Sequence, residues 1–270
     1  MKFVNTSVLQ LLKVYDDTGG QLMTQKAKRE RKNTLNQYMT NNFGADCDII
    51  MNPEKALHQG ISVVTTTWNE KENIIELIQR IHLILKDSPH EIIVIDDGSP
   101  DGTLEIAKQY ADIAISKQHE GQTSGLLFGV KLAKFPLIIT IDADLENPPE
   151  LIPIITQKLV DCDVVVASRR ALPRFSEKWA AKTLGKICNT TDFYSNFRAY
   201  KKEVVAESTL RYGETFGGEL LILAKKHGYK VCDLEYDPPP RRGSPRIGGT
   251  IKANFRINIA TIKCFLAYLF

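Results

Sequence analysis

Short apolar runs alternate with amphipathic segments along the chain from residue 60 onward. Runs rich in β-branched and apolar side chains predict buried strands over residues 61–67, 91–95, 111–115, 137–141 and 163–167. Segments with apolar residues at helical spacing predict helices over residues 69–86, 103–110 and 124–134, with a further helix after Pro149. This alternation predicts an α/β fold in which a mostly parallel sheet carries helices on both faces.

Polar motifs follow the ends of the predicted strands. In parallel sheets, ligands bind beyond the carboxyl ends of the strands, so side chains that follow different strands meet at one edge. The motifs are Thr67–Glu70, Asp96–Thr103, Asp142–Asp144 and Ser168–Arg170. Solvated loops would place polar residues at both edges, but acidic pairs that recur at strand ends predict a ligand site.

The segment Asp142-Ala143-Asp144 is the most informative of these motifs. Two carboxylates one residue apart at a strand end can hold a hard divalent cation. Mg²⁺ or Mn²⁺ takes a few carboxylates and fills its other positions with phosphate oxygens. The segment therefore indicates an enzyme that handles a nucleotide diphosphate, although short acidic triplets are also common in solvated loops.

The bulk composition excludes some classes of protein. The 270 residues are 43% hydrophobic and 25% charged, which argues against wholesale disorder. A net charge of +3 is too small to indicate nucleic acid as the main partner. The sequence has no run of roughly 20 apolar residues and no convincing secretory signal, so we expect a cytoplasmic protein.

The cysteines are widely spaced and form no Cys-x-x-Cys pair. They are Cys47, Cys162, Cys188, Cys232 and Cys264. No histidine lies at zinc-finger spacing from them. This pattern predicts reduced thiols, as in a cytoplasmic protein.

The two ends of the chain differ in pattern from the domain at residues 59–250. Residues 1–58 are expected to form a basic, partly helical N-terminal extension, in which the basic stretch Lys26–Lys32 is more typical of a solvated helix face than of a membrane-binding segment. Residues 251–270 predict an amphipathic helix. Its apolar positions are Phe255, Ile259, Ile262, Leu266 and Leu269. Either the helix closes the core, or it lies in a membrane interface.

The ordered motifs over about residues 60 to 250 resemble the family-2 glycosyltransferases, in particular their dolichyl-phosphate mannose synthase branch. Thr66–Glu70 resembles the Pro-Thr-Tyr-Asn-Glu segment of that branch, and Asp96–Thr103 matches its Asp-Asp-x-Ser-x-Asp-x-Thr motif fully. Asp142–Glu150 matches Asp-Ala-Asp-Leu-Gln-His-Pro-Pro-Glu, with Glu and Asn in place of Gln and His. Asp192–Arg198 matches Asp-x-x-Ser-Gly-Phe-Arg, with Asn in place of Gly.

This resemblance implies a GT-A type fold with a Rossmann-like sheet, a nucleotide-sugar donor, and Mg²⁺ or Mn²⁺. The donor is expected to contact Thr66, Trp68, Glu70, Asp96, Asp97, Ser99, Asp142 and Ala143. The cation is expected on Asp142, Asp144 and Glu146. The acceptor phosphate is expected on Ser168, Arg169, Arg198, Arg241 and Arg246. Catalysis is expected to involve Asp144, Arg198 and Glu219.

The resemblance further implies inverting transfer of a hexose from GDP-mannose or a UDP-hexose to a polyprenyl (dolichyl) phosphate. A phosphate monoester is already anionic at pH 7 and needs no general base, whereas a hydroxyl acceptor needs one. Two alternatives stay open: transfer to a hydroxyl of a protein, glycan or lipid, and a catalytically weak nucleotide-sugar-binding subunit. A dinucleotide-dependent oxidoreductase is disfavoured, because no Gly-x-Gly-x-x-Gly follows the first strand.

The expected acceptor also implies a location. A polyprenyl phosphate keeps its tail in the bilayer, so the resemblance implies a cytoplasmic protein that associates peripherally with the membrane. The membrane surface, or a small membrane-protein partner, is expected to supply the anchor.

Overall fold

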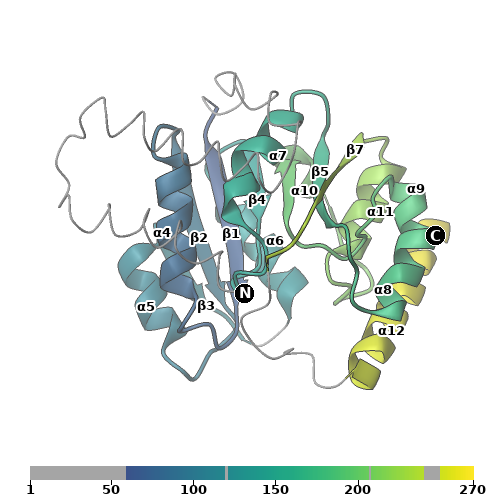
Figure 1. Ribbon diagram of the computed structural model, residues 1–270, viewed down its shortest axis with the longest axis horizontal. Helices are drawn as coiled ribbons and strands as arrows, with labels where there is room; N and C mark the ends of the chain where they lie inside the picture. The colour runs from purple at the N-terminus through teal and green to yellow at the C-terminus, as the bar shows by residue number, and fades with distance from the viewer. Residues whose placement is uncertain (1–58, 119–120, 207, 240–249) are drawn as a thin grey trace. The chain divides into compact units, whose positions relative to one another are not determined.

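The computed structural model describes residues 59–118, 121–206, 208–239 and 250–270 (Figure 1). The predicted N-terminal extension and the predicted acceptor contacts Arg241 and Arg246 lie outside the described residues. Within this part of the chain, one seven-stranded sheet has the order β3-β2-β1-β4-β6-β5-β7. The strands are β1 Ile61–Thr67, β2 His90–Asp96, β3 Ile113–Ser116, β4 Leu137–Thr140, β5 Val164–Arg169, β6 Arg198–Lys201 and β7 Val231–Tyr236.

The sheet is mostly parallel, as predicted. Among the described strands, β6 runs antiparallel to its neighbours β4 and β5, and the other pairs are parallel. Neither β6 nor β7 is predicted from the sequence, because neither segment carries an uninterrupted apolar run. Insertion of β6 between β4 and β5 brings the Asp192–Arg198 motif to the same sheet edge as the acidic triplet.

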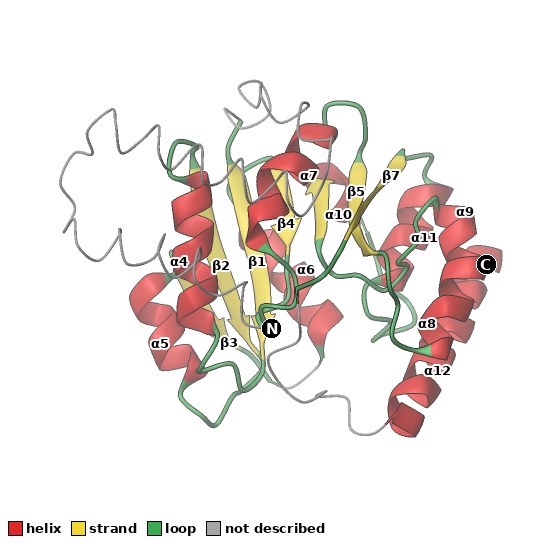
Figure 2. Cartoon of the chain, viewed as in Figure 1, coloured by secondary structure: helices red, strands yellow, loops and turns green. Residues whose placement is uncertain are grey.

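Helices cover both faces of the sheet, which confirms the predicted layers (Figure 2). In chain order they are α4 Ile74–Leu85, α5 Thr103–Tyr110, α6 Gln122–Leu132, η2 Pro149–Leu151, α7 Ile152–Lys158, α8 Phe175–Ala180, η3 Ala181–Gly185, α9 Lys186–Cys188, α10 Lys202–Ala206, α11 Gly218–Lys226 and α12 Thr250–Leu269. Helix α4 begins at Ile74 rather than at Asn69 as predicted. The reason is a turn at residues 69–73, in which Asn69 has a φ of 57° and the Asn73 N–H donates to the Glu70 carbonyl.

Helix α6 lies unusually close to the sheet. A side chain at Gly129 would collide with Val64 of β1, and a Cβ at Gly125 would lie 2.8 Å from Cγ2 of Thr66. Glycine at these two positions therefore permits the close approach. As a result, the N-terminus of α6 lies directly beside the end of β1, where the predicted site begins.

Helix α12 packs against α8 and α11, but not through its predicted apolar stripe. Its inward face consists mostly of small residues, all buried: Ala253, Ile257, Ala260, Thr261, Cys264 and Ala267. The predicted stripe from Phe255 to Leu269 faces outward instead, and Phe255 is 66% exposed. In the described part of the chain, no helix is both long and apolar enough to cross a bilayer.

A disulfide joins Cys162 to Cys232, which makes the prediction of reduced thiols wrong for this pair. The N–H groups of Asp163 and Val164 donate to the Lys230 carbonyl, so the starts of β5 and β7 lie side by side. The two Cα atoms are 6.1 Å apart, within the range that a disulfide can bridge. The 70-residue separation of the cysteines gave no indication of this pairing. Cys188 and Cys264 are buried free thiols.

Reduction is expected to destabilise the protein, because the disulfide restricts a long loop in the unfolded chain. A loop of this length corresponds to about 4 kcal/mol of unfolding free energy. Urea denaturation with and without reductant measures the difference. The matched control is the double variant Cys162→Ala and Cys232→Ala, whose stability should not respond to reductant. Equal sensitivity of wild type and variant would contradict the pairing.

Candidate active site

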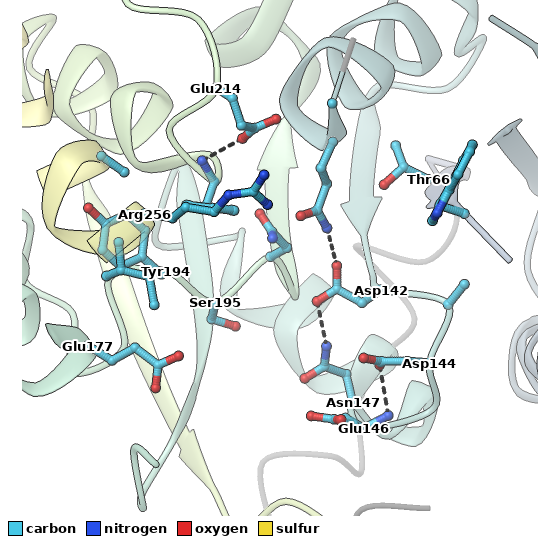
Figure 3. A pocket seen from close by; sticks show the side chains of 18 of the residues that line it. Thr66, Asp142, Asp144, Glu146, Asn147, Glu177, Tyr194, Ser195, Glu214 and Arg256 are labelled. Carbon is cyan, nitrogen blue, oxygen red and sulfur yellow. Dashed lines mark hydrogen bonds between the residues drawn. The ribbon is translucent and has the colours of Figure 1, made fainter. Parts of the chain in front are cut away.

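A cavity of about 610 Å³ lies at the carboxyl ends of the central strands (Figure 3). This volume is in the range that small-molecule sites usually have. Its walls come from the ends of β1, β4 and β5, the start of α6, the loops that precede β6 and α11, and one flank of α12. The lining includes nine predicted site residues: Thr66, Trp68, Glu70, Asp97, Asp142, Ala143, Asp144, Glu146 and Arg169.

Two predicted donor contacts, Asp96 and Ser99, do not line the cavity. Asp96 is 1% exposed, and its carboxylate accepts hydrogen bonds from Thr67 Oγ1 at 2.9 Å and Ser99 Oγ at 2.6 Å. The N–H groups of Gly98 and Ser99 also donate to Asp96. These bonds fix the turn that presents Asp97, which itself pairs with Lys117 at 2.8 Å.

Asp142 lies at the floor of the cavity and is held from two sides. Gln122 donates a hydrogen bond to one of its carboxylate oxygens, and Asn147 Nδ2 donates to the other at 3.3 Å. Asn147 Oδ1 in turn accepts a hydrogen bond of 2.6 Å from the Tyr236 hydroxyl. Burial, together with the nearby charge of Asp144, raises the pKa of Asp142 to about 7. A divalent cation beside the two carboxylates would offset this repulsion.

The paired carboxylates of Asp142 and Asp144 fit a divalent cation. In the residues that the structure describes, no group of three or more His, Cys, Asp or Glu side chains is arranged to hold a metal ion. Glu146 lines the cavity with the two aspartates and stays a predicted ligand, and its backbone N–H donates to Asp144 Oδ1 at 3.1 Å. A cation on Asp142 and Asp144 would take its other ligands from the donor diphosphate and water.

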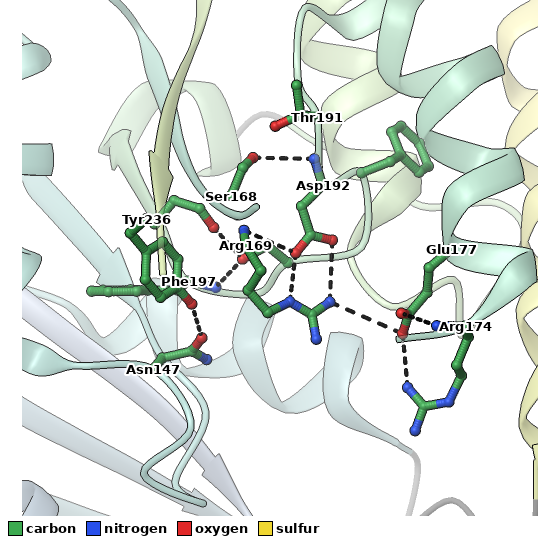
Figure 4. Close-up of polar contacts among 12 residues, drawn as sticks. Asn147, Ser168, Arg169, Arg174, Glu177, Thr191, Asp192, Phe197 and Tyr236 are labelled. Carbon is green, nitrogen blue, oxygen red and sulfur yellow. Dashed lines mark hydrogen bonds and ion pairs between the residues drawn. The ribbon is translucent and has the colours of Figure 1, made fainter. Parts of the chain in front are cut away.

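Of the predicted acceptor contacts that the structure describes, Arg169 lines the cavity, and Figure 4 shows its contacts with Asp192 and Glu177. Asp192, which is fully buried, accepts two hydrogen bonds from its guanidinium, at 2.6 Å from Nε and 3.2 Å from Nη2. Burial alone would lower the pKa of Arg169, but the charge and hydrogen bonds of Asp192, with a contribution from Glu177, raise it above the ordinary value. Asp192 thus holds the positively charged Arg169 guanidinium at a fixed place on the cavity wall.

Ser168 does not line the cavity, although it is a predicted acceptor contact. Its buried hydroxyl donates to Asp233 and accepts from the Asp192 N–H at 3.1 Å. Asp233 also accepts hydrogen bonds from Thr190 and Thr191. Ser168 therefore belongs to the buried network that positions Asp192.

The predicted catalytic residues Arg198 and Glu219 are also buried behind the cavity. Arg198 donates to the carbonyls of Gly217 at 2.7 Å and Phe193 at 2.9 Å. Glu219 accepts from the backbone N–H groups of Arg211 and Tyr212. Each is 1% exposed, so the structure places both where they hold loops rather than where they meet a substrate.

Several cavity residues were not predicted from the sequence. They are Gln122, Asn147, Arg174, Glu177, Tyr194, Ser195, Asn196, Glu214, Phe216, Arg256 and Lys263. Arg174 and Glu177, three residues apart, form the capping box of α8 and pair at 2.7 Å. Arg256 and Lys263 are seven residues apart, a spacing that places them on one side of a helix. This spacing could have predicted from the sequence that the two cations act together.

Solved structures of glucosyl-3-phosphoglycerate synthase from Mycobacterium tuberculosis share this architecture. The complex with phosphoglyceric acid has a TM-score of 0.67 at 21% identity and covers 80% of this chain and 84% of that one. The complex with Mn²⁺, uridine-diphosphate and glucosyl-3-phosphoglycerate has a TM-score of 0.64 at 22% identity, with the same coverage. The likeness establishes a GT-A-like α/β fold.

Residues 62–212 match the sequence profile of glycosyl transferase family 2, and the chain belongs to this family. The dolichol-phosphate mannosyltransferase of Pyrococcus furiosus is 32% identical over 212 residues, which are 70% of this chain and 59% of that protein. The undecaprenyl-phosphate 4-deoxy-4-formamido-L-arabinose transferase of Aeromonas hydrophila is 32% identical over 196 residues, 65% of this chain and 58% of that protein. This chain thus spans less than two thirds of the length of these curated relatives. The resemblance stated from the motifs is confirmed at the level of the family.

Replacement of Asp192 by Asn should destabilise the protein by about 3 kcal/mol, because it leaves the largely buried Arg169 without its carboxylate. Equilibrium denaturation in urea measures this loss. The matched control is Asp237→Asn, which breaks the neighbouring Arg170–Asp237 pair, also 2.6 Å long but 50% and 62% exposed. A loss below about 1 kcal/mol is expected there. Similar losses in both variants would show that burial of the Arg169–Asp192 pair contributes little to the free energy of unfolding.

Proposed function

We propose that the protein transfers a hexose from a nucleotide-diphosphate sugar, GDP-mannose or a UDP-hexose, to a polyprenyl phosphate with inversion. The observation that carries the proposal is a single cavity with two opposite charge environments. Asp142 and Asp144 lie on one side of it and Arg256 on the other (Figure 3), and its wall also carries Arg169, Arg174 and Lys263. The names of the two curated relatives support a polyprenyl-phosphate acceptor.

The donor would occupy the acidic end of the cavity. Trp68, which is 39% exposed at the cavity wall, offers an aromatic face for the base, and Asp97 lies nearby. Asp142 and Asp144 would hold Mg²⁺ or Mn²⁺, which would neutralise charge on the departing diphosphate. Solved structures with the same fold that contain uridine-diphosphate with Mn²⁺ or Mg²⁺ support this part of the proposal.

The acceptor would enter from the cationic side. Its phosphate oxygen would attack the anomeric carbon as the bond to the diphosphate breaks, and the bonding electrons would leave with the nucleotide. Arg169 suits the task of positioning an anionic nucleophile, because Asp192 fixes the planar guanidinium in one orientation. The acceptor is already charged, so the step requires no general base.

A hydroxyl acceptor is a second candidate, because the cavity also contains the carboxylates Glu177 and Glu214. A general base must be able to accept a proton from the acceptor. Glu177 already pairs with Arg174, and Glu214 accepts hydrogen bonds from Thr123 and from the Phe216 N–H. These contacts already occupy the carboxylate oxygens that would have to accept the proton of a hydroxyl acceptor, which favours the phosphate acceptor.

Incubation of purified protein with labelled donor and polyprenyl phosphate separates these functions. Transfer to the phosphate gives an acid-labile lipid product, whereas transfer to a hydroxyl gives an acid-stable one. A subunit that only binds the donor gives neither product, yet is stabilised against heat by the donor with Mg²⁺ or Mn²⁺. A thermal-shift screen across common nucleotide sugars identifies the base and the sugar.

The variant Asp144→Asn should lose transfer activity by at least about 100-fold, because it removes one of the two charges that would hold the cation. Its thermal unfolding should stay cooperative, and its Mn²⁺-dependent stabilisation by the donor should disappear. Asp161→Asn is the control, since Asp161 is an exposed aspartate outside the cavity. Wild-type turnover by Asp144→Asn would contradict the assignment of Asp144 as a ligand of the cation.

A further inference from the structure

One face of α12 presents large apolar side chains to solvent. Ile251, Phe255, Ile262 and Leu269 are 87%, 66%, 56% and 68% exposed, respectively. At 3.6 residues per turn, these positions and Ile259 and Leu266 fall on one side of the helix. The small buried residues of α12 fall on the opposite side, so packing against the protein does not account for the large ones.

Helix α8 extends this surface. Phe175 is 78% exposed and Trp179 is 39% exposed, and the Trp179 ring lies 6.2 Å from the ring of Phe265 in α12. The two helices lie side by side in the structure (Figure 2). We name this surface the α8–α12 face and define it by Phe175, Trp179, Phe255, Ile259, Ile262 and Leu266. An exposed apolar surface built from two helices is typical of an interaction site.

The charges of α12 lie along one edge of this face. The helix carries Lys252, Arg256 and Lys263 and contains no acidic residue. Helical spacing places these three cations together on one flank. Arg256 and Lys263 line the cavity, as does Ile259. The apolar face, the basic flank and the acceptor side of the cavity therefore adjoin one another.

We infer that the α8–α12 face lies against the surface of an anionic lipid bilayer, with the basic flank of α12 at the level of the headgroups. The inference rests on the proposed function, because a polyprenyl phosphate has its phosphate at the membrane surface and its tail in the hydrocarbon. In this orientation the phosphate reaches the cavity past Arg256 and Lys263, while the tail stays among the lipids. Apolar side chains beside a basic flank are the pattern of a helix in a membrane interface.

The charge pattern favours a bilayer over a second copy of the chain. A two-fold interface places the same surface patch on both partners, so the cations of one α12 would meet a helix without acidic residues. Anionic lipid headgroups supply the missing negative charge, and each Lys or Arg near such a surface adds to the attraction.

Co-sedimentation of the full chain with lipid vesicles tests this surface. Wild-type protein should sediment with vesicles of phosphatidylcholine and phosphatidylserine, and much less with phosphatidylcholine alone or at high salt. The double variant Phe255→Ser and Ile262→Ser should lower the partition coefficient by at least about tenfold. The matched control is Phe128→Ser with Val160→Ser, which removes two exposed apolar side chains elsewhere and should bind as the wild type does.

A transfer assay in detergent separates failure of the surface from failure of the proposed function. With a short-chain polyprenyl phosphate in micelles, the double variant should retain wild-type activity, since neither substituted residue lines the cavity. With vesicle-embedded acceptor its activity should fall along with its binding. Absence of transfer by the wild type in micelles would refute the proposed function and leave the vesicle result standing.

The inference is overturned if wild type and double variant, with equal melting curves, sediment equally with anionic vesicles. It is also overturned if the wild type fails to bind vesicles and sediments as a dimer that the double variant dissociates. That outcome would assign the α8–α12 face to a second copy of the chain.

Discussion

The placement of the partly buried Asp142 carboxylate beside Asp144 is the constraint on which the site depends. A buried charge is costly, and a like charge nearby raises the cost further. Gln122 and Asn147 offset part of this cost by donating hydrogen bonds to the two carboxylate oxygens, and Tyr236 holds Asn147. These residues come from α6, the loop after β4, and β7. The position of one carboxylate is therefore tied to three elements, and the pair that it forms with Asp144 is what suits the site to a divalent cation.

The cationic side of the cavity is fixed by a second buried network. Asp192 orients Arg169, and Asp192 is itself held through Ser168, which donates to Asp233. A polar network whose members are all paired is rigid, and an unpaired member would be expensive. Asp233 follows Cys232 directly, so the disulfide anchors the strand that carries the centre of this network.

The sequence was sufficient to predict the strands up to β5, the ligand-binding edge and most of the acidic lining, because apolar runs and strand-end motifs are local signals. Long-range features were not predictable in this way. The disulfide depends on β7 pairing with β5, and Arg198 is buried because β6 inserts between β4 and β5. The periodicity of α12 identified two faces but not which one is inward, since a helix that is apolar on both sides gives no such signal.

Close packing decides the orientation of α12. A side chain at Gly218 of α11 would lie 2.8 Å from Cys264 Sγ, so only small residues fit where the two helices meet. The small side chains of α12 must therefore face inward. Its large apolar side chains lie on the opposite side of the helix and so face outward. The same rotation places Arg256 and Lys263 on the cavity wall. Steric fit at one helix contact thus sets the acceptor-side charge of the cavity and the exposed apolar face beside it.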